Sequence, residues 1–287
     1  MTQRKNHKTT KTVVPAQPSR PAEAEKMQGA AKESKKAWRK LLSWVLLHGL
    51  GVIFTFYIVQ YGVSFLLYLI YGEEKLITLS NDPVFVTLVS AVVYSLILAL
   101  VLVVPKKLFK QKLTREELGL IGLPTWMDIL LSPTAFVVYL IGASILTYIV
   151  SAVFPGFDVN QAQDVGYTAE NLVSQLDYLL AFLALVVVAP VAEEIIFRGY
   201  LYGKLRSKLT SRYGIAISMV VVSALFGLAH GQWNVGVNVF VMSLVMCGLR
   251  EITGSVWSGV LLHMLKNGIA YYFLFVNPSA MNSIIGN

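Results

Sequence analysis

The stretch Leu185-Val-Val-Val-Ala-Pro-Val-Ala-Glu-Glu-Ile-Ile-Phe-Arg198 carries two adjacent carboxylates and an arginine inside an otherwise apolar run. A charge at the centre of a membrane helix costs roughly 2.5–3.5 kcal/mol on insertion scales. Two acidic residues in a row, with Arg198 four residues after Glu194, therefore need a compensating use. The stretch predicts a membrane-embedded helix that carries a functional site.

The composition of the whole chain supports a membrane location. Of 287 residues, 55% are hydrophobic and 14% are charged, whereas a soluble domain has about 25% charged residues. The apolar residues come in blocks of about 20, long enough to cross a hydrocarbon core of about 30 Å. We therefore expect an all-α, polytopic transmembrane helical bundle in the cell membrane, with no nucleic-acid partner. The expected spans are residues 41–71, 83–104, 126–153, 177–199, 214–231, 234–250 and 254–276.

The charges of the loops indicate a cytoplasmic N-terminus. Residues 1–40 hold eleven Lys or Arg against three Glu, which equals the net charge of +8 of the whole chain. Basic loops at 105–125 and 200–213 alternate with acidic loops at 72–82 and 154–176. Seven spans that start in the cytoplasm require this alternation, because positive loops are retained on the cytoplasmic side.

The chain is expected to have three parts. The basic tail, residues 1–40, contains three prolines, few large apolar residues and no periodicity, so we expect it to be disordered. The tail either contacts anionic lipid headgroups or only sets the topology. Residues 41–277 form the transmembrane helical domain, and residues 278–287 form a short tail. Membrane lipids are the first expected partner.

Three smaller features have structural interpretations. The segment Leu113–Leu120 is expected to form a short surface helix, with Thr114 as N-cap and Glu117 at capping-box spacing. Cys247 lies in an apolar run and is expected to be a small packing residue. His48, in the first span, is expected to be a satisfied or interfacial histidine rather than a catalytic one.

Helical spacing separates the roles of the two glutamates. Glu194 and Arg198 are four residues apart, so they share a helix face and can pair. Glu193 points about 100° away from Glu194. Pro190 removes a backbone donor and can bend the helix, which would open room for water near Glu193. We therefore expect Glu194 to balance Arg198 and Glu193 to face a polar cavity.

Two further polar groups lie in later spans. His263 and Asn267 are four residues apart on one helix face, with Lys266 at its edge. His230 ends the fifth span, where neighbouring glycines at 227 and 231 allow close helix approach. A carboxylate, two imidazoles and an amide that converge from three helices can activate water and stabilise an oxyanion. Polar contacts that only hold helices together, or a proton relay of a transporter, are the alternatives.

Three motifs, in this order along the chain, resemble the signature of the CPBP family: Glu193-Glu194-x-x-x-Arg198, Phe226-x-x-x-His230 and His263-x-x-x-Asn267. This family comprises CAAX prenyl endopeptidases and bacteriocin-processing or immunity-type proteins, and is also called Abi. The resemblance covers about residues 172–276, the expected catalytic core, and the Leu-Gly-Leu element at 118–120. It implies an intramembrane endopeptidase that cleaves a membrane-associated or lipidated peptide or protein. A catalytically idle immunity or binding protein of the same fold is the alternative.

The resemblance also implies catalytic roles. Glu193 would be the base that activates water, and His230 would help to position that water. His263 and Asn267 would stabilise the oxyanion. These four residues are the expected catalytic set.

The same residues suggest a competing role for a metal. Glu193, His230 and His263 could supply the two-histidine, one-carboxylate set of a catalytic zinc ion. The H-E-x-x-H signature of zinc proteases is absent from the sequence. We expect no metal, with zinc as the alternative, and we expect Glu194 and Arg198 to hold the site together.

If the spans are straight, His230 and Glu193 lie at different depths in the membrane and cannot meet. His230 falls at the outer end of the fifth span, whereas Glu193 falls in the cytoplasmic half of the fourth. The two residues meet only if the fourth helix extends past Leu201 toward Leu209, or if the turn at Gly231–Gly236 is recessed. Because irregular backbone is tolerated where it lines a cavity, we expect both.

Overall fold

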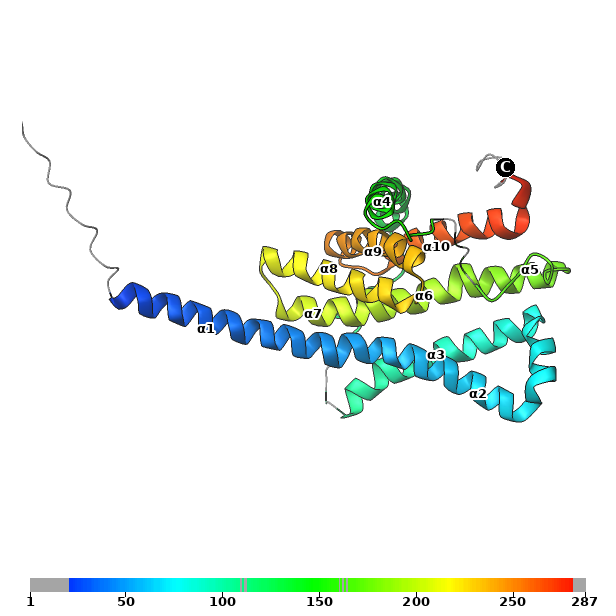
Figure 1. The fold of residues 1–287 in the computed structure, drawn as a ribbon, viewed down its shortest axis with the longest axis horizontal. Helices are drawn as coiled ribbons and strands as arrows, with labels where there is room; N and C mark the ends of the chain where they lie inside the picture. The colour runs from blue at the N-terminus through cyan, green and yellow to red at the C-terminus, as the bar shows by residue number, and fades with distance from the viewer. Residues whose placement is uncertain are drawn as a thin grey trace, which may run out of the picture. The chain divides into compact units, whose positions relative to one another are not determined.

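The computed structural model describes residues 21–108, 110, 113–159, 161, 163 and 165–280, and these residues contain helices and no β-strand. The chain divides into two compact units, Met1–Ser43 and Trp44–Asn287. Within the described residues, seven helices are long and apolar enough to cross a membrane, which confirms the expected all-α fold (Figure 1). They are Lys32–Ser80, Pro83–Leu108, Trp126–Val153, Gln175–Lys208, Arg212–Ala229, Trp233–Thr253 and Trp257–Val276.

The N-terminal part differs from the expected disordered tail. Residues 1–20 lie outside the described residues, and helix α1 (Pro21–Trp44) occupies the rest of the segment expected to be disordered. Its many Ala, Glu, Lys and Gln residues favour a helix, and proline is well tolerated at the first helical position. The expectation of disorder rested on the scarcity of large apolar side chains. A helix of this kind needs only favourable local propensity.

The loop expected at 72–82 is largely helical. The first candidate span includes η1 (Val45–Gly49), a π-helical turn, and α2 (Leu50–Ser80). Gly72, with φ +72° and ψ 170°, is the one break inside α2 as described. The glutamates, lysine and leucines after it favour resumption of the helix. Only a tight turn then separates α2 from α3 (Pro83–Leu108).

The fourth candidate span is a helix of 34 residues, Gln175–Lys208, and Figure 1 shows it as one continuous rod. An extension past Leu201 toward Leu209 was expected, because Glu193 and His230 would otherwise lie at different depths. The helix does reach Lys208. Glu193 therefore lies near the middle of the rod. The rod consists of α5 (Gln175–Phe182), η2 (Leu183–Val188), α6 (Ala189–Glu194), η3 (Ile195–Tyr202) and α7 (Gly203–Lys208).

Five further helical segments complete the part of the chain that the structure describes. They are α4 (Trp126–Val153), α8 (Arg212–Ala229), α9 (Trp233–Thr253), α10 (Trp257–Tyr271) and the π-helical η4 (Tyr272–Val276). The rod contacts α3, α8 and α10, while α4 packs against α9 and α10. The close approach of α8 and α9 occurs at Gly227 and Gly236, where a Cβ on Gly227 would lie 2.8 Å from the Gly236 carbonyl oxygen. Gly231, expected at this contact, instead makes the turn with φ +68°.

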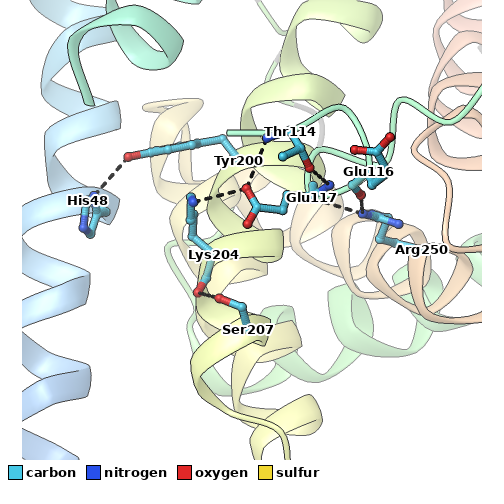
Figure 2. Close-up of polar contacts among 8 residues, drawn as sticks. All are labelled: His48, Thr114, Glu116, Glu117, Tyr200, Lys204, Ser207 and Arg250. Atoms are coloured by element: carbon cyan, nitrogen blue, oxygen red, sulfur yellow. Dashed lines mark hydrogen bonds and ion pairs between the residues drawn. The ribbon is translucent and has the colours of Figure 1, made fainter. Parts of the chain in front are cut away.

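The segment expected to form a surface helix is a single capped turn, residues 114–120 (Figure 2). The Thr114 amide donates to Glu117 Oε2, and the Glu117 amide donates to Thr114 Oγ1, both at 3.2 Å. These are the two hydrogen bonds of the expected capping box.

The capped turn ends at Gly119. The Gly119 amide donates to the Glu116 carbonyl at 3.0 Å, and the Leu120 amide donates to the Arg115 carbonyl at 2.8 Å. With φ +68° at Gly119, this pattern is a Schellman motif, in which glycine takes the left-handed conformation after the last helical residue. The glycine of the Leu-Gly-Leu element therefore stops the helix after one turn.

The capped turn lies directly on the long rod. Arg250 of α9 donates to the Glu117 carbonyl at 3.3 Å (Figure 2). A Cβ on Gly203 would lie 2.6 Å from the same carbonyl oxygen, and one on Gly199 would lie 3.0 Å from that of Leu118. Two glycines one helical turn apart thus let the backbone of the capped turn rest on the helix that carries the two glutamates.

Candidate active site

Glu194 and Arg198 form a buried ion pair. Arg198 Nη1 donates to Glu194 Oε1 at 2.8 Å, and both side chains are 0% exposed. The Arg198 guanidinium carbon lies 4.3 Å from the centroid of the Phe226 ring, within the range of a cation–π interaction. Spacing of four residues puts the two charges on one face of the rod, and the aromatic ring of α8 covers them.

Glu193 has different surroundings from its neighbour. Its side chain is 13% exposed, and Tyr94 of α3 donates a hydrogen bond of 2.8 Å to Oε1. Its other oxygen, Oε2, lies 4.0 Å from His263 Nε2. Glu193 is therefore the more accessible carboxylate, with one oxygen fixed by a hydroxyl and the other facing an imidazole.

His263 of α10 connects the two glutamates. Its Nδ1 lies 3.2 Å from Glu194 Oε1. An ionised carboxylate only accepts hydrogen bonds. Nδ1 of His263 therefore carries a hydrogen and donates a hydrogen bond to Glu194. In the neutral imidazole, Nε2 then presents a lone pair toward Glu193; in the imidazolium, Nε2 donates.

Asn267 donates a hydrogen bond to a backbone carbonyl that Pro190 leaves without an amide donor. In the π-helical register of η2, the Ala189 amide donates to the Ala184 carbonyl, so the next carbonyl, Leu185, would accept from residue 190. Proline has no amide hydrogen, which leaves the Leu185 carbonyl free. Asn267 Nδ2 donates to it at 2.9 Å. This hydrogen bond uses one of the two amide hydrogens and ties α10 to η2.

His230 follows the last residue of α8. Its Nδ1 donates to the Phe226 carbonyl at 2.8 Å, which leaves Nε2 without a proton in the neutral ring. The Phe226 ring packs edge-on against both histidines, with centroids 4.8 Å from His230 and 6.0 Å from His263. His230 also interacts electrostatically with Glu193. The seven residues of the three motifs thus lie around one region of the rod.

Two residues at this site were missed by sequence reasoning. Tyr94 is a single tyrosine in an apolar span, which gives no pattern that separates it from a packing residue. Gly259 of α10 faces Glu194, and a Cβ there would lie 2.9 Å from Glu194 Oε2. His48, expected to be satisfied rather than catalytic, lies 3.1 Å from the Tyr200 hydroxyl (Figure 2).

The histidines and carboxylates of the site are also the groups that a metal ion would use. Among the residues that the structure describes, no three His, Cys, Asp or Glu side chains lie together in a way that could hold a metal ion. His263 directs Nδ1 to Glu194, and His230 directs Nδ1 to a backbone carbonyl. Cys247 is buried and free. Both histidines keep Nε2 outside these bonds, and Nε2 is the nitrogen that would bind zinc in the alternative, because a metal-bound histidine usually donates its other ring N–H to a carboxylate or a carbonyl.

Comparisons with known proteins match the part of the chain that holds the site. Residues 175–269, which include all three motifs, match the family model "Type II CAAX prenyl endopeptidase Rce1-like". The chain is 27% identical to the membrane-embedded CAAX protease MroQ of Staphylococcus aureus (strain USA300) over 122 residues, or 42% of this chain and 49% of that protein. The chain thus matches about half the length of this curated relative. No solved structure matches it significantly.

The fold and the site define a multi-pass membrane protein with a polar cluster among its helices. The matched family model and the relative are both described as CAAX-type proteases, the class of protein to which the CPBP family, resembled by the three motifs, also belongs. At the family level, the matches correspond to CAAX-type intramembrane proteases.

Proposed function

We propose that this chain is an intramembrane endopeptidase that hydrolyses a peptide bond in a membrane-associated or lipidated peptide or protein. The family match supports the reaction class, since it covers the residues that would perform the reaction. The cluster of ionisable groups supports it as well, because such groups inside membrane segments usually serve a function.

The observation that carries the mechanism is the 4.0 Å separation between Glu193 Oε2 and His263 Nε2. This distance is too long for a direct hydrogen bond, and one water molecule can bond both atoms at ordinary hydrogen-bond lengths of about 2.8 Å. Glu193 would take a proton from this water as the oxygen attacks the substrate carbonyl carbon. It would then give the proton to the leaving amine as the carbon–nitrogen bond breaks, so that Glu193 returns to its starting state.

The remaining motif residues support the charge that develops on the carbonyl oxygen. His263 can donate from Nε2 as an imidazolium, which the Glu194 carboxylate at Nδ1 stabilises. Asn267 keeps a second amide hydrogen after its bond to Leu185. His230, beside Glu193, would hold the water in place through its free Nε2. Together these groups would stabilise the tetrahedral intermediate without a metal ion.

The topology belongs to the same proposal. With the N-terminus in the cytoplasm, the segment between the fourth and fifth spans and the capped turn lie on the cytoplasmic side. Glu193, near the middle of the rod, then lies deep in the membrane. The substrate bond would have to reach this depth, which favours a substrate that is anchored in the bilayer.

A comparison of peptides released by cells tests the proposal. One strain makes the intact chain and a second makes Glu193→Ala at the same level in the membrane. We expect one or more peptides to be present with the intact chain and absent with the variant, and these peptides identify the substrate. Identical peptide profiles from both strains would contradict the protease and favour a catalytically idle binding or immunity protein.

A further inference from the structure

A polar cavity lies next to the candidate active site. Its volume is about 240 Å³, and it is formed by α4, α9, α10 and the loop after α4. Its polar lining includes Tyr139, Asn234, Asn238 and Lys266. Lys266 lies one helical turn beyond His263 on α10, so this cavity is a neighbour of the catalytic cluster.

Lys266 is the cation in the lining of this cavity. It forms no ion pair or hydrogen bond with the residues that the structure describes, although it interacts electrostatically with Glu193. A lysine in a membrane span is costly and usually marks a site that serves a function. Its ammonium group therefore has its hydrogen-bonding capacity available to a ligand in the cavity.

Two asparagines of α9 add complementary groups. Tyr139 of α4 donates to Asn238 Oδ1, so the amide nitrogen of Asn238 is left as a donor without a described acceptor. Asn234 donates to the Gln161 carbonyl at 2.7 Å, and its buried Oδ1 accepts no hydrogen bond from the residues that the structure describes. The cavity thus offers one cation, one neutral donor and one acceptor.

This combination fits a peptide segment that bears a carboxylate. The two carboxylate oxygens would accept from the Lys266 ammonium and the Asn238 amide, and a peptide N–H would donate to Asn234 Oδ1. Other candidate ligands fit less well, because a neutral apolar segment would leave the ammonium unpaired and a second cation would be repelled.

We propose that this cavity is a substrate subsite in which Lys266 and Asn238 bind a carboxylate of the peptide beside the bond to be cleaved. The inference rests on the proposed peptidase function, since a peptide bound in the cavity is a substrate only if the neighbouring Glu193 acts in the cleavage of a peptide bond. The carboxylate comes from the C-terminus of the peptide or from an acidic side chain. Lys266 is therefore the residue that selects for an acidic group near the cleaved bond.

The test measures peptide binding to the full chain carrying Glu193→Gln, which prevents cleavage, in nanodiscs of phosphatidylcholine. Three fluorescent peptides carry the same N-terminal acyl chain and have the same sequence except at the last residue of the third. The first ends in a free carboxylate, the second ends in an amide, and the third ends in an amide with Glu as its last residue. Lys266→Met removes the charge, Lys266→Arg keeps it, and Lys75→Met is the matched control at an exposed lysine of α2.

We expect at least one carboxylate peptide to bind about tenfold or more tightly than the neutral amide, as charge-assisted hydrogen bonds predict. Lys266→Met should abolish this preference, whereas Lys266→Arg and Lys75→Met should keep it. The favoured peptide distinguishes a C-terminal carboxylate from an acidic side chain. Equal affinity for all three peptides, no binding of any, or a preference that survives in Lys266→Met would overturn the proposal.

Cleavage of the same peptides by the chain with Glu193 intact separates the two proposals. A carboxylate preference that depends on Lys266, without any cleavage, would retain the subsite and reject the peptidase. Cleavage that depends on Glu193 but ignores the carboxylate would retain the peptidase and reject the subsite.

Discussion

His263 Nδ1 lies 3.2 Å from Glu194 Oε1, the same carboxylate oxygen that Arg198 contacts at 2.8 Å. The buried ion pair therefore also orients the histidine whose other nitrogen faces Glu193. This shared oxygen links the stability of the bundle to the tautomer of the candidate catalytic imidazole. Removal of Glu194 should therefore affect the stability of the fold, whereas removal of Glu193 should affect catalysis.

Removal of Arg198 should destabilise the fold strongly. Arg198→Met leaves the Glu194 carboxylate buried without its cation, which typically costs about 3–5 kcal/mol. The double variant Arg198→Met with Glu194→Gln should recover part of this loss, because both charges are gone. The free energy of unfolding, measured by denaturant titration in detergent micelles, checks this. If the double variant loses as much as the sum of the two single variants, the residues do not act as a pair.

Tyr94 should position Glu193 without contributing much to stability. Tyr94→Phe removes the 2.8 Å hydrogen bond to Glu193 Oε1, and we expect kcat/KM to fall about tenfold, in line with a hydrogen bond to a charged group. Tyr148→Phe, at a tyrosine that is 75% exposed, is the matched control. Unchanged kcat/KM in Tyr94→Phe would show that the contact does not serve catalysis.

The capped turn should open when Gly119 gains a side chain. Gly119→Ala places a residue with Cβ at φ +68°, which costs about 1–2 kcal/mol, and its Cβ would collide with the Arg250 guanidinium carbon. We expect faster trypsin cleavage after Arg115 in the solubilised chain. Gly156→Ala, where a Cβ meets nothing within 4 Å, is the control and should leave this rate unchanged. Equal rates for both variants would mean that Gly119 does not hold the turn in place.

Chelation of metal ions should leave cleavage intact. The proposed mechanism uses Glu193 and His263 on a water molecule and needs no Lewis acid. Activity of the purified chain should therefore survive incubation with a strong chelator and its removal by gel filtration. Loss of activity that added zinc restores would support the zinc peptidase instead.

Hydropathy and spacing predicted the features that depend on nearby residues. The seven spans follow from apolar blocks of membrane length, and the contact of Glu194 with Arg198 follows from a spacing of four residues on one helix. The capping box of Thr114 and Glu117 is likewise present at its expected spacing. Each of these features is decided within about one turn of helix or by average composition.

The particular contacts that Tyr94 and Asn267 make between helices were not predictable. Tyr94 reaches Glu193 from another span, and nothing in its local sequence marks that contact. The bond from Asn267 to Leu185 requires both the π-helical register of η2 and the missing amide of Pro190. The expected bend at this proline drew attention to the correct place, but the register shift is visible only in three dimensions.

The most direct test of the central claim is cleavage in water labelled with heavy oxygen, with the substrate that the peptide comparison identifies. The chain with Glu193 should form product with one labelled oxygen in the new carboxylate. Glu193→Gln should lower the rate about a hundredfold or more, as loss of a general base predicts, while its unfolding midpoint stays near that of the unchanged chain. A Glu193→Gln variant that cleaves at the unchanged rate would contradict the assignment of Glu193 as the base.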